Sequence, residues 1–241
     1  MNKHTALTEV ALERPPRGGR VSVRARRVER AVRLAPETLA PASGPIGGPA
    51  KRAFDAMSAF AGLVFLSPLL LLVALIIRLE TPGEAIFRQE RGGFGGRKFK
   101  IWKFRTMTCA ECGGTARQAQ RGDGRITRFG AFLRKTSIDE LPQLVNVLMG
   151  DMSLIGPRPH ALRQDADFAR VDPRYPMRAL ARPGITGLAQ VTGLRGPTDN
   201  DASIIARTSQ DLTYIESWSP WLDVRILTRT LLFAWNDPHA F

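Results

Sequence analysis

Residues 53–79 read AFDAMSAFAGLVFLSPLLLLVALIIRL, and this apolar run decides the fold of the chain. A helix needs about 20 apolar residues to span the hydrocarbon core of a bilayer, so the run is long enough to enter a membrane. Ser67-Pro68 lies near its middle, where a proline removes one helix hydrogen bond and disturbs the preceding turn. The run therefore predicts a membrane helix that is broken near its centre.

Basic residues flank this run on both sides. Lys51 and Arg52 precede it, and Arg78, Arg88, Arg91, Arg97, Lys98 and Lys100 follow. Basic flanks favour the cytoplasmic face of a membrane. If both flanks stay there, residues 51–82 enter the membrane and return as a re-entrant helix–break–helix hairpin. A kinked helix that crosses once is the alternative, because spanning helices also contain prolines.

The segment before the apolar run, residues 1–50, is rich in Arg, Pro and Ala and predicts a disordered basic tail. The whole chain has 35 Lys and Arg against 22 Asp and Glu, a formal charge of +13. This excess indicates anionic partners, and nucleic acid, anionic membrane lipids and phosphorylated small molecules all qualify. The tail is either attracted to a lipid surface or simply solvated.

The segment after the run, residues 83–241, predicts a mostly helical α+β domain. Short strands at 85–89 and 98–104 form a small β-hairpin, and the glycines between them lack the spacing of a phosphate-binding loop. Residues 218–235 combine tryptophans, aliphatic residues and arginines, which fits either an interfacial amphipathic helix or a core helix. Further helices are expected at 129–135, 140–149, 161–168 and 204–218.

The two cysteines, Cys109 and Cys112, form a lone C-x-x-C. A structural zinc site needs four ligands, and no second cysteine pair or nearby histidine completes one. We therefore expect a reduced loop that faces the cytosol.

The stretch at 134–143, RKTSIDELPQ, carries the clearest chemical signal. Two adjacent carboxylates such as Asp139 and Glu140 are more often a helix cap than a site. Here two turns that place an arginine beside prolines follow, GPRP at 156–159 and RPGITG at 182–187. Arginines held by neighbouring prolines suit phosphate recognition. Together with the membrane segment they indicate phosphoryl transfer to a lipid, with one carboxylate attacking phosphorus and the other holding Mg²⁺.

From residue 51 onward the chain resembles the bacterial sugar transferase family, the monotopic phosphoglycosyl transferases that act on polyprenyl phosphate. Each matching motif is weak alone, but together they cover nearly all of residues 51–230. The motifs are KRxFD at 51–55, the Ser67-Pro68 break, KFRTM at 103–107, LRKTSIDELPQ at 133–143, GDMSLIGPRP at 150–159, RPGITGLAQ at 182–190, and the pattern Tyr214, Trp218-Ser219, Asp223.

The resemblance implies a re-entrant hairpin broken at Ser67 and Pro68, with the catalytic domain on the cytosolic face of the bacterial inner membrane. It also implies a ping-pong reaction in which Asp139 attacks a UDP-sugar, UMP leaves, and undecaprenyl phosphate takes the phosphosugar. Glu140 would assist as a Mg²⁺ ligand beside Asp139 or as a proton acceptor. The implied phosphate-binding residues are Arg105, Arg134 and Arg158, and the implied nucleotide-sugar region comprises Arg182, Pro183, Gly184 and Gln190.

The sequence departs from the family in one loop. Relatives usually read QVxGRN where residues 190–195 here read QVTGLR. The counterpart of the family arginine is either Arg195, reached through a reshaped loop, or absent, which puts donor preference or efficiency in doubt. Glucose or galactose 1-phosphate is the favoured donor group, and exopolysaccharide synthesis the favoured pathway. The oligomeric state stays open, with a homodimer as one option.

Two other functions compete with the transferase. The chain could be a membrane-anchored basic adaptor without catalytic activity, or a degenerate family member with a damaged loop at Leu194. The tail arginines lack interleaved aromatics and no nucleic-acid-binding module occurs, so nucleic acid is not an expected partner. The presence of Asp139, Glu140 and Arg158 favours an active enzyme.

Overall fold

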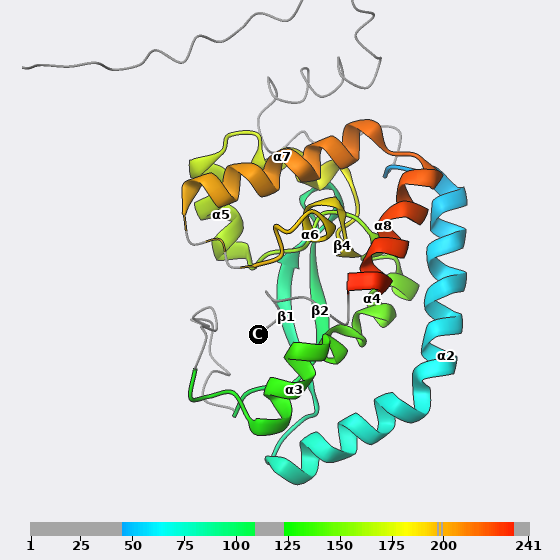
Figure 1. Cartoon of the computed structure of the whole chain (residues 1–241), viewed down its shortest axis with the longest axis vertical. Coiled ribbons are helices and arrows are strands. Elements are labelled where there is room, and N and C mark those ends of the chain that lie inside the picture. The colour runs from blue at the N-terminus through cyan, green and yellow to red at the C-terminus, as the bar shows by residue number, and fades with distance from the viewer. Residues whose placement is uncertain (1–44, 109–122, 197, 199, 234–241) are drawn as a thin grey trace, which may run out of the picture.

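The computed structural model describes residues 45–108, 123–196, 198 and 200–233 (Figure 1). Most of the predicted basic tail, the Cys109/Cys112 pair and the last residues of the predicted C-terminal helix lie outside them. The described helices and strands are, in chain order, α2 (Gly48–Glu80), β1 (Ile86–Gly92), β2 (Lys98–Phe104), α3 (Arg128–Thr136), α4 (Gln143–Met149), β3 (Ser153–Ile155), α5 (Leu162–Val171), β4 (Gly184–Thr186), α6 (Leu188–Val191), α7 (Asp201–Ser217) and α8 (Pro220–Phe233). Three short 3₁₀ helices lie between them, η2 (Phe94–Gly96), η3 (Ile138–Glu140) and η4 (Tyr175–Leu180).

The apolar run forms one long helix, α2, which bends near its middle (Figure 1). Pro68 has no N–H to donate to the carbonyl of Val64, four residues earlier. The hydroxyl of Ser67 donates to that carbonyl instead, at 2.8 Å. The serine thus satisfies the acceptor that the proline leaves without its helical partner, and the two arms remain one bent helix.

Most of α2 carries its apolar side chains on the outside of the protein. It is the one helix in the described part of the chain that is long and apolar enough to cross a membrane, and only 11% of its most apolar window is buried. Phe65 is 83% exposed and Leu79 77% exposed. Such a continuous apolar surface fits contact with lipid and not with water.

The predicted β-hairpin is present. β1 and β2 pair antiparallel, with a register that runs from Ile86 opposite Phe104 to Gly92 opposite Lys98. A second, parallel pair was not predicted: β3 pairs with β4, with Ser153 opposite Gly184. Each strand of this pair has three residues, too few for a hydrophobic period to be read from the sequence.

The parallel pair brings the two proline-rich turns together. A side chain on Gly156 would overlap the carbonyl of Arg182, and one on Gly184 would overlap the backbone of Gly156. These glycines therefore allow two backbones to touch directly. The GPRP turn at 156–159 and the RPGITG turn at 182–187 consequently form one unit, although helix α5 and the 3₁₀ helix η4 separate them in the chain.

The C-terminal helix α8 packs on the core, as one of the two predicted roles requires, and its interfacial role stays a prediction. Ile226 is buried in the core cluster that contains Leu212 and Tyr214. Trp221 and Leu232, by contrast, are 76% and 71% exposed. One face of α8 thus packs on the core, and the other keeps large apolar side chains at the surface.

We expect Ser67→Ala to lower the stability of the detergent-solubilised protein by about 1–2 kcal/mol, because the Val64 carbonyl would lose its partner. The double variant S67A/P68A should recover that loss, since an alanine in place of Pro68 supplies an N–H for the same carbonyl. Thermal unfolding of the wild type and the variants, including P68A alone, measures the effect. Equal midpoints for S67A and the wild type would contradict this role of the serine.

Candidate active site

The paired carboxylates lie on a sharp turn between two helices. Helix α3 ends where Ser137 adopts a left-handed conformation, with φ of 57°, and the 3₁₀ helix η3 follows directly. Asp139 and Glu140 are 9% and 8% exposed. The sequence predicts both as part of the helix start at 140–149; instead they precede α4, which begins at Gln143.

Glu140 is the most heavily bonded side chain of the turn. Arg158 donates from Nη1 to Oε2 at 3.0 Å and from Nη2 to Oε1, and Lys103 donates from Nζ to Oε1 at 2.8 Å. Burial alone would raise the pKa of Glu140, but the charges of Arg158 and Lys103 outweigh it and hold that pKa well below its usual value. Glu140 is therefore ionised and already neutralised by its two partners.

Asp139 is in the opposite situation. Its carboxylate accepts no hydrogen bond from the described residues, although it is buried. Burial, followed by the charge of Glu140, raises the pKa of Asp139 to about 6, against the opposing charges of Lys103, Arg134 and Arg158. A carboxylate without hydrogen-bond donors keeps its electron pairs available, so Asp139 suits nucleophilic attack better than Glu140 does.

Two of the predicted arginines lie next to this turn. Arg134 donates from Nε to Thr106 at 2.8 Å, and its charge acts on Asp139. Arg195 donates from Nη2 to the hydroxyl of Ser137 at 2.6 Å. The altered loop therefore brings Arg195 to a residue that lies two positions before Asp139.

Arg105 has a different position from the one that the resemblance implied. Its guanidinium is buried and donates to the carbonyls of Pro82 at 2.6 Å and Thr81 at 2.7 Å, at the C-terminal end of α2. Carbonyls at a helix C-terminus attract a cation because they have no intrahelical partner. Arg105 thus caps the C-terminal end of α2, and its phosphate-binding role stays a prediction.

The expected nucleotide-sugar region, 182–190, divides into two parts. Pro183 and Gly184 lead into strand β4, which is packed against the turn that carries Arg158. Gln190 donates from Nε2 to the carbonyl of Ile185 at 3.2 Å, within its own segment. Arg182 instead lines a small cavity at the start of α2, where Arg52 and Asp55 are its charged neighbours.

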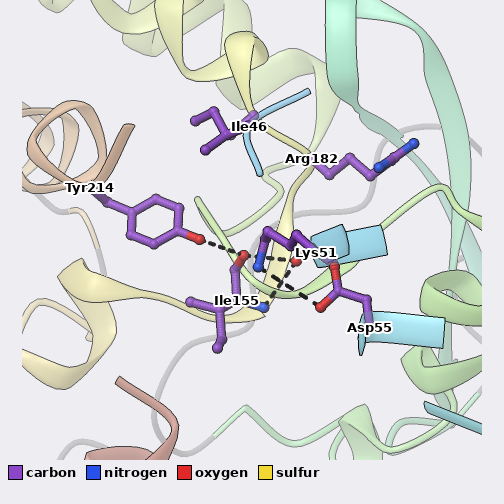
Figure 2. Close-up of a pocket in the computed structure, with 8 residues that line it drawn as sticks. Ile46, Lys51, Asp55, Ile155, Arg182 and Tyr214 are labelled. Carbon is purple, nitrogen blue, oxygen red and sulfur yellow. Dashed lines mark hydrogen bonds and ion pairs between the residues drawn. The ribbon is translucent and has the colours of Figure 1, made fainter. Parts of the chain in front are cut away.

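This cavity joins two sequence motifs that are far apart (Figure 2). Lys51 donates to Asp223 at 2.7 Å, and the hydroxyl of Tyr214 donates to the same carboxylate at 2.8 Å. Asp55 accepts from the backbone N–H of Leu154 at 3.2 Å. The KRxFD motif at the base of α2 and the late Tyr–Trp–Asp pattern thus form one buried polar network, which anchors the helix.

Lys103 is the site residue that the sequence analysis missed. It lies on β2, where buried Phe99, Ile101 and Phe104 share the strand with more exposed residues. The signal available in the sequence was a lysine directly before the buried Phe104, in a strand whose apolar and polar residues otherwise alternate. Its partner could not be inferred, because the ion pair joins positions 37 residues apart.

Among the described residues, no group of three or more His, Cys, Asp or Glu side chains is arranged to hold a metal ion. The oxygens of Glu140 are occupied by Arg158 and Lys103, so the predicted metal-ligand role of Glu140 does not fit this arrangement. Within the turn, Asp139 is the carboxylate that keeps unbonded oxygens. Mg²⁺ commonly binds through one or two carboxylates and the phosphates of a substrate, which is compatible with Asp139.

Comparison with known proteins identifies relatives of this chain. A family model described as "Bacterial sugar transferase" matches residues 47–237. A UDP-glucose:undecaprenyl-phosphate glucose-1-phosphate transferase of Caulobacter vibrioides is 52% identical over 191 residues, which are 79% of this chain and 72% of that protein. The exopolysaccharide production protein PSS of Rhizobium leguminosarum is 47% identical over 76% of this chain and 93% of its own length.

A second glucose-1-phosphate transferase of the same name, from Escherichia coli, is 43% identical over 79% of this chain. The aligned part covers only 41% of that longer relative. The family match over residues 47–237 includes α2, the Asp139–Glu140 turn and the turn that carries Arg158. The chain belongs to the bacterial sugar transferase family.

Proposed function

We propose that this protein transfers a hexose 1-phosphate from a UDP-sugar to undecaprenyl phosphate, releases UMP, and so initiates the synthesis of an exopolysaccharide or another glycoconjugate. The observation that carries the proposal is the buried Asp139 carboxylate, which accepts no hydrogen bond from the described residues beside a fully paired Glu140. The names of the two glucose-1-phosphate transferases favour glucose as the sugar.

The proposed reaction has two displacement steps at one phosphorus atom. An oxygen of Asp139 bonds to the phosphorus next to the sugar, and the bond from that phosphorus to the bridging oxygen breaks, so that UMP leaves with the electron pair. A phosphate oxygen of undecaprenyl phosphate then attacks the same phosphorus and releases the carboxylate of Asp139. The product is a sugar linked to the lipid through a diphosphate.

The neighbours of Asp139 would hold the phosphates for both steps. Arg158 and Lys103 are fixed by Glu140, so their positions are set before a substrate arrives. Arg134 and Arg195 lie on the other segments next to the turn. In this arrangement Glu140 acts as the anchor of two cations; the strong depression of its pKa makes it a poor proton acceptor.

We include Mg²⁺ as a proposed cofactor, with Asp139 as its protein ligand and the donor diphosphate supplying further oxygens. When bound, the ion would offset the charge of the diphosphate and of the departing UMP. Asp139 would still have to present one oxygen to phosphorus.

We also propose that α2 is re-entrant, with both ends on the cytosolic face of the inner membrane. The helix has 33 residues and is about 50 Å long, which exceeds the thickness of the hydrocarbon core. Yet Lys51 at its start is bound to Asp223, and the carbonyls of Thr81 and Pro82, directly after its last residue, are bound to Arg105. Because both ends are tied to one folded domain, a bent entry and return fits better than a single crossing.

The detergent-solubilised protein is expected to release UMP from UDP-glucose continuously only with undecaprenyl phosphate and Mg²⁺, and at most once per enzyme without the lipid. Asp139→Asn should abolish turnover, since an amide is not a competent nucleophile at phosphorus. Asp167→Asn, which alters an exposed aspartate on α5, is the matched control and should keep wild-type rates. Full turnover by D139N would rule out the covalent mechanism, and a panel of UDP-sugars identifies the donor.

The first half-reaction should lose rate as the pH falls below about 6, approaching tenfold per pH unit, because the proton must leave Asp139 before attack. Glu140 does not contribute to this acidic limb of the pH–rate profile, since its pKa lies well below the usual value. Raising Mg²⁺ should move the limb to lower pH, because a bound cation favours the carboxylate form. Rapid-quench measurement of the UMP burst between about pH 5 and 8 provides the profile. A burst rate that does not depend on pH in this range contradicts the assignment.

Membrane topology can be tested with single cysteines in a background without Cys109 and Cys112. A cysteine at Ala50 and one at Glu84, both exposed positions near the two ends of α2, should both react with an impermeant maleimide in inverted membrane vesicles. Neither should react in intact spheroplasts. Reaction of the two positions from opposite sides would show a single crossing.

A further inference from the structure

A second group of arginines lies beyond Arg158, around the buried His160. Arg178 and Arg207 approach the two ring nitrogens of His160, at 3.2 Å from Nδ1 and 3.4 Å from Nε2. Arg91 lies on β1, at an isolated β-bridge to Ala161. The sequence analysis assigned no function to any of these residues except Arg158.

Arg178 has a structural task. Its Nε donates to Asp211 at 2.8 Å and its Nη2 donates to the carbonyl of Arg158 at 2.6 Å. A buried arginine with a carboxylate partner and further hydrogen bonds is satisfied by the fold. It also holds the backbone of Arg158 in place.

Arg91 and Arg207 have no carboxylate bound to them in this way. Arg91 donates from Nη2 to the side-chain oxygen of Gln89 at 2.6 Å, and Arg207 donates from Nη2 to the carbonyl of Gly196, so the hydrogen-bond acceptors of both are uncharged. Neither forms an ion pair with a carboxylate within the part of the chain that the structure describes. The Nε atom of each is buried without a hydrogen bond, and Arg207 as a whole is only 8% exposed. Burial and the neighbouring charge of Arg158 lower the pKa of each to about 10. Buried unpaired charges cost stability, so a fold that keeps two of them beside Arg158 is built for an anion.

The hydrogen bonds of His160 show how Arg207 is oriented. The hydroxyl of Tyr175 donates to Asp165 at 2.5 Å, so its oxygen accepts from Nδ1–H of His160, 2.7 Å away. In this tautomer the 3.2 Å approach of Arg178 Nη1 to Nδ1 is not a hydrogen bond, and the lone pair lies on Nε2, which faces Nη1 of Arg207. Burial and the surrounding arginines keep the pKa of His160 far below its usual value, so the ring stays neutral. Asp165, Tyr175 and His160 thus form a chain that ends at Nη1 of Arg207, while the carbonyl of Gly196 holds its Nη2.

We propose that Arg91 and Arg207 bind a substrate phosphate next to Arg158, and that His160 is the positioning residue for Arg207. The inference rests on the proposed function, which supplies two candidate phosphates: the diphosphate of the UDP-sugar and the phosphate of undecaprenyl phosphate. Both present oxygens that match the planar guanidinium fork. Arg158 links this group of arginines to the reacting turn, because its guanidinium is bound to Glu140.

The proposal is tested with two variants, Arg91→Gln and Arg207→Gln. The matched control is Arg163→Gln, which alters an exposed arginine on α5. The UMP burst measured against UDP-glucose concentration reports on the donor, and steady-state turnover against undecaprenyl phosphate reports on the lipid. We expect each variant to raise the KM for one of the two substrates roughly tenfold to a hundredfold. The substrate whose KM changes identifies the phosphate that is bound. Unchanged KM values for both substrates in both variants overturn the proposal and leave the proposed function intact.

Thermal unfolding without substrate separates binding from folding. Because Arg91 and Arg207 are unneutralised, R91Q and R207Q should unfold at or above the wild-type temperature, whereas Arg178→Gln, which leaves Asp211 unpaired, should unfold lower. Pyrophosphate should raise the midpoint of the wild type more than that of R91Q or R207Q. The binding role is contradicted if pyrophosphate stabilises the wild type, R91Q and R207Q equally. It is also contradicted if R91Q and R207Q both unfold at a lower temperature than the wild type without ligand. This readout remains valid if the wild type releases UMP from no UDP-sugar, an outcome that overturns the proposed function alone.

The role of His160 has its own test. His160→Phe keeps the aromatic contact with Phe168 and removes the Nε2 acceptor. H160F should raise the same KM that R207Q raises, and it should change kcat less than KM. The double variant H160F/R207Q should have nearly the same KM as R207Q alone. Additive effects on KM would show that His160 does not act through Arg207.

Discussion

The ion pairs of Glu140 are the interaction on which the arrangement of the site depends. The carboxylate of Glu140 lies on the turn that carries the proposed nucleophile. It binds Lys103 of β2 and Arg158 of the GPRP turn, and so joins these three segments. Each of these segments comes from a different part of the sequence. Because a buried charge needs compensation, removing Glu140 would leave both Lys103 and Arg158 without their carboxylate. The same pairing leaves Asp139 as the carboxylate of the turn with unbonded oxygens.

The membrane helix is integrated into this arrangement instead of being attached to it. Its first turn is bound through Lys51 to Asp223, and its last turn is capped by Arg105. Helix α2 also contacts α3 and α4, the two helices on either side of the Asp139–Glu140 turn. The turn is therefore held close to the long apolar helix, where the proposed function would bring the head group of a long-chain lipid phosphate.

The sequence predicted the elements with strong local signals and missed those that depend on pairing. The bend at Ser67-Pro68, the hairpin β1–β2 and the longer helices are visible in residue type and period. The parallel pair β3–β4 and the 3₁₀ turn under Asp139 are too short for any period. Arg105 was assigned to phosphate because its motif was recognised. Its contacts with the carbonyls of Thr81 and Pro82 could not be predicted, because they arise only when the end of strand β2 reaches the end of α2.

By itself the sequence determined that the chain has a broken apolar helix, a carboxylate pair beside arginines, and the motifs of the bacterial sugar transferases. Those features are local, and each follows from composition, spacing or a proline. Tertiary structure decided which carboxylate is neutralised and which is left without donors, because that depends on Lys103 and Arg158 arriving from distant segments. It also decided that the buried Arg207 and the partly buried Arg91 have no carboxylate ion-pair partner among the described residues. Charge balance is a property of three-dimensional neighbours, and linear spacing does not specify it.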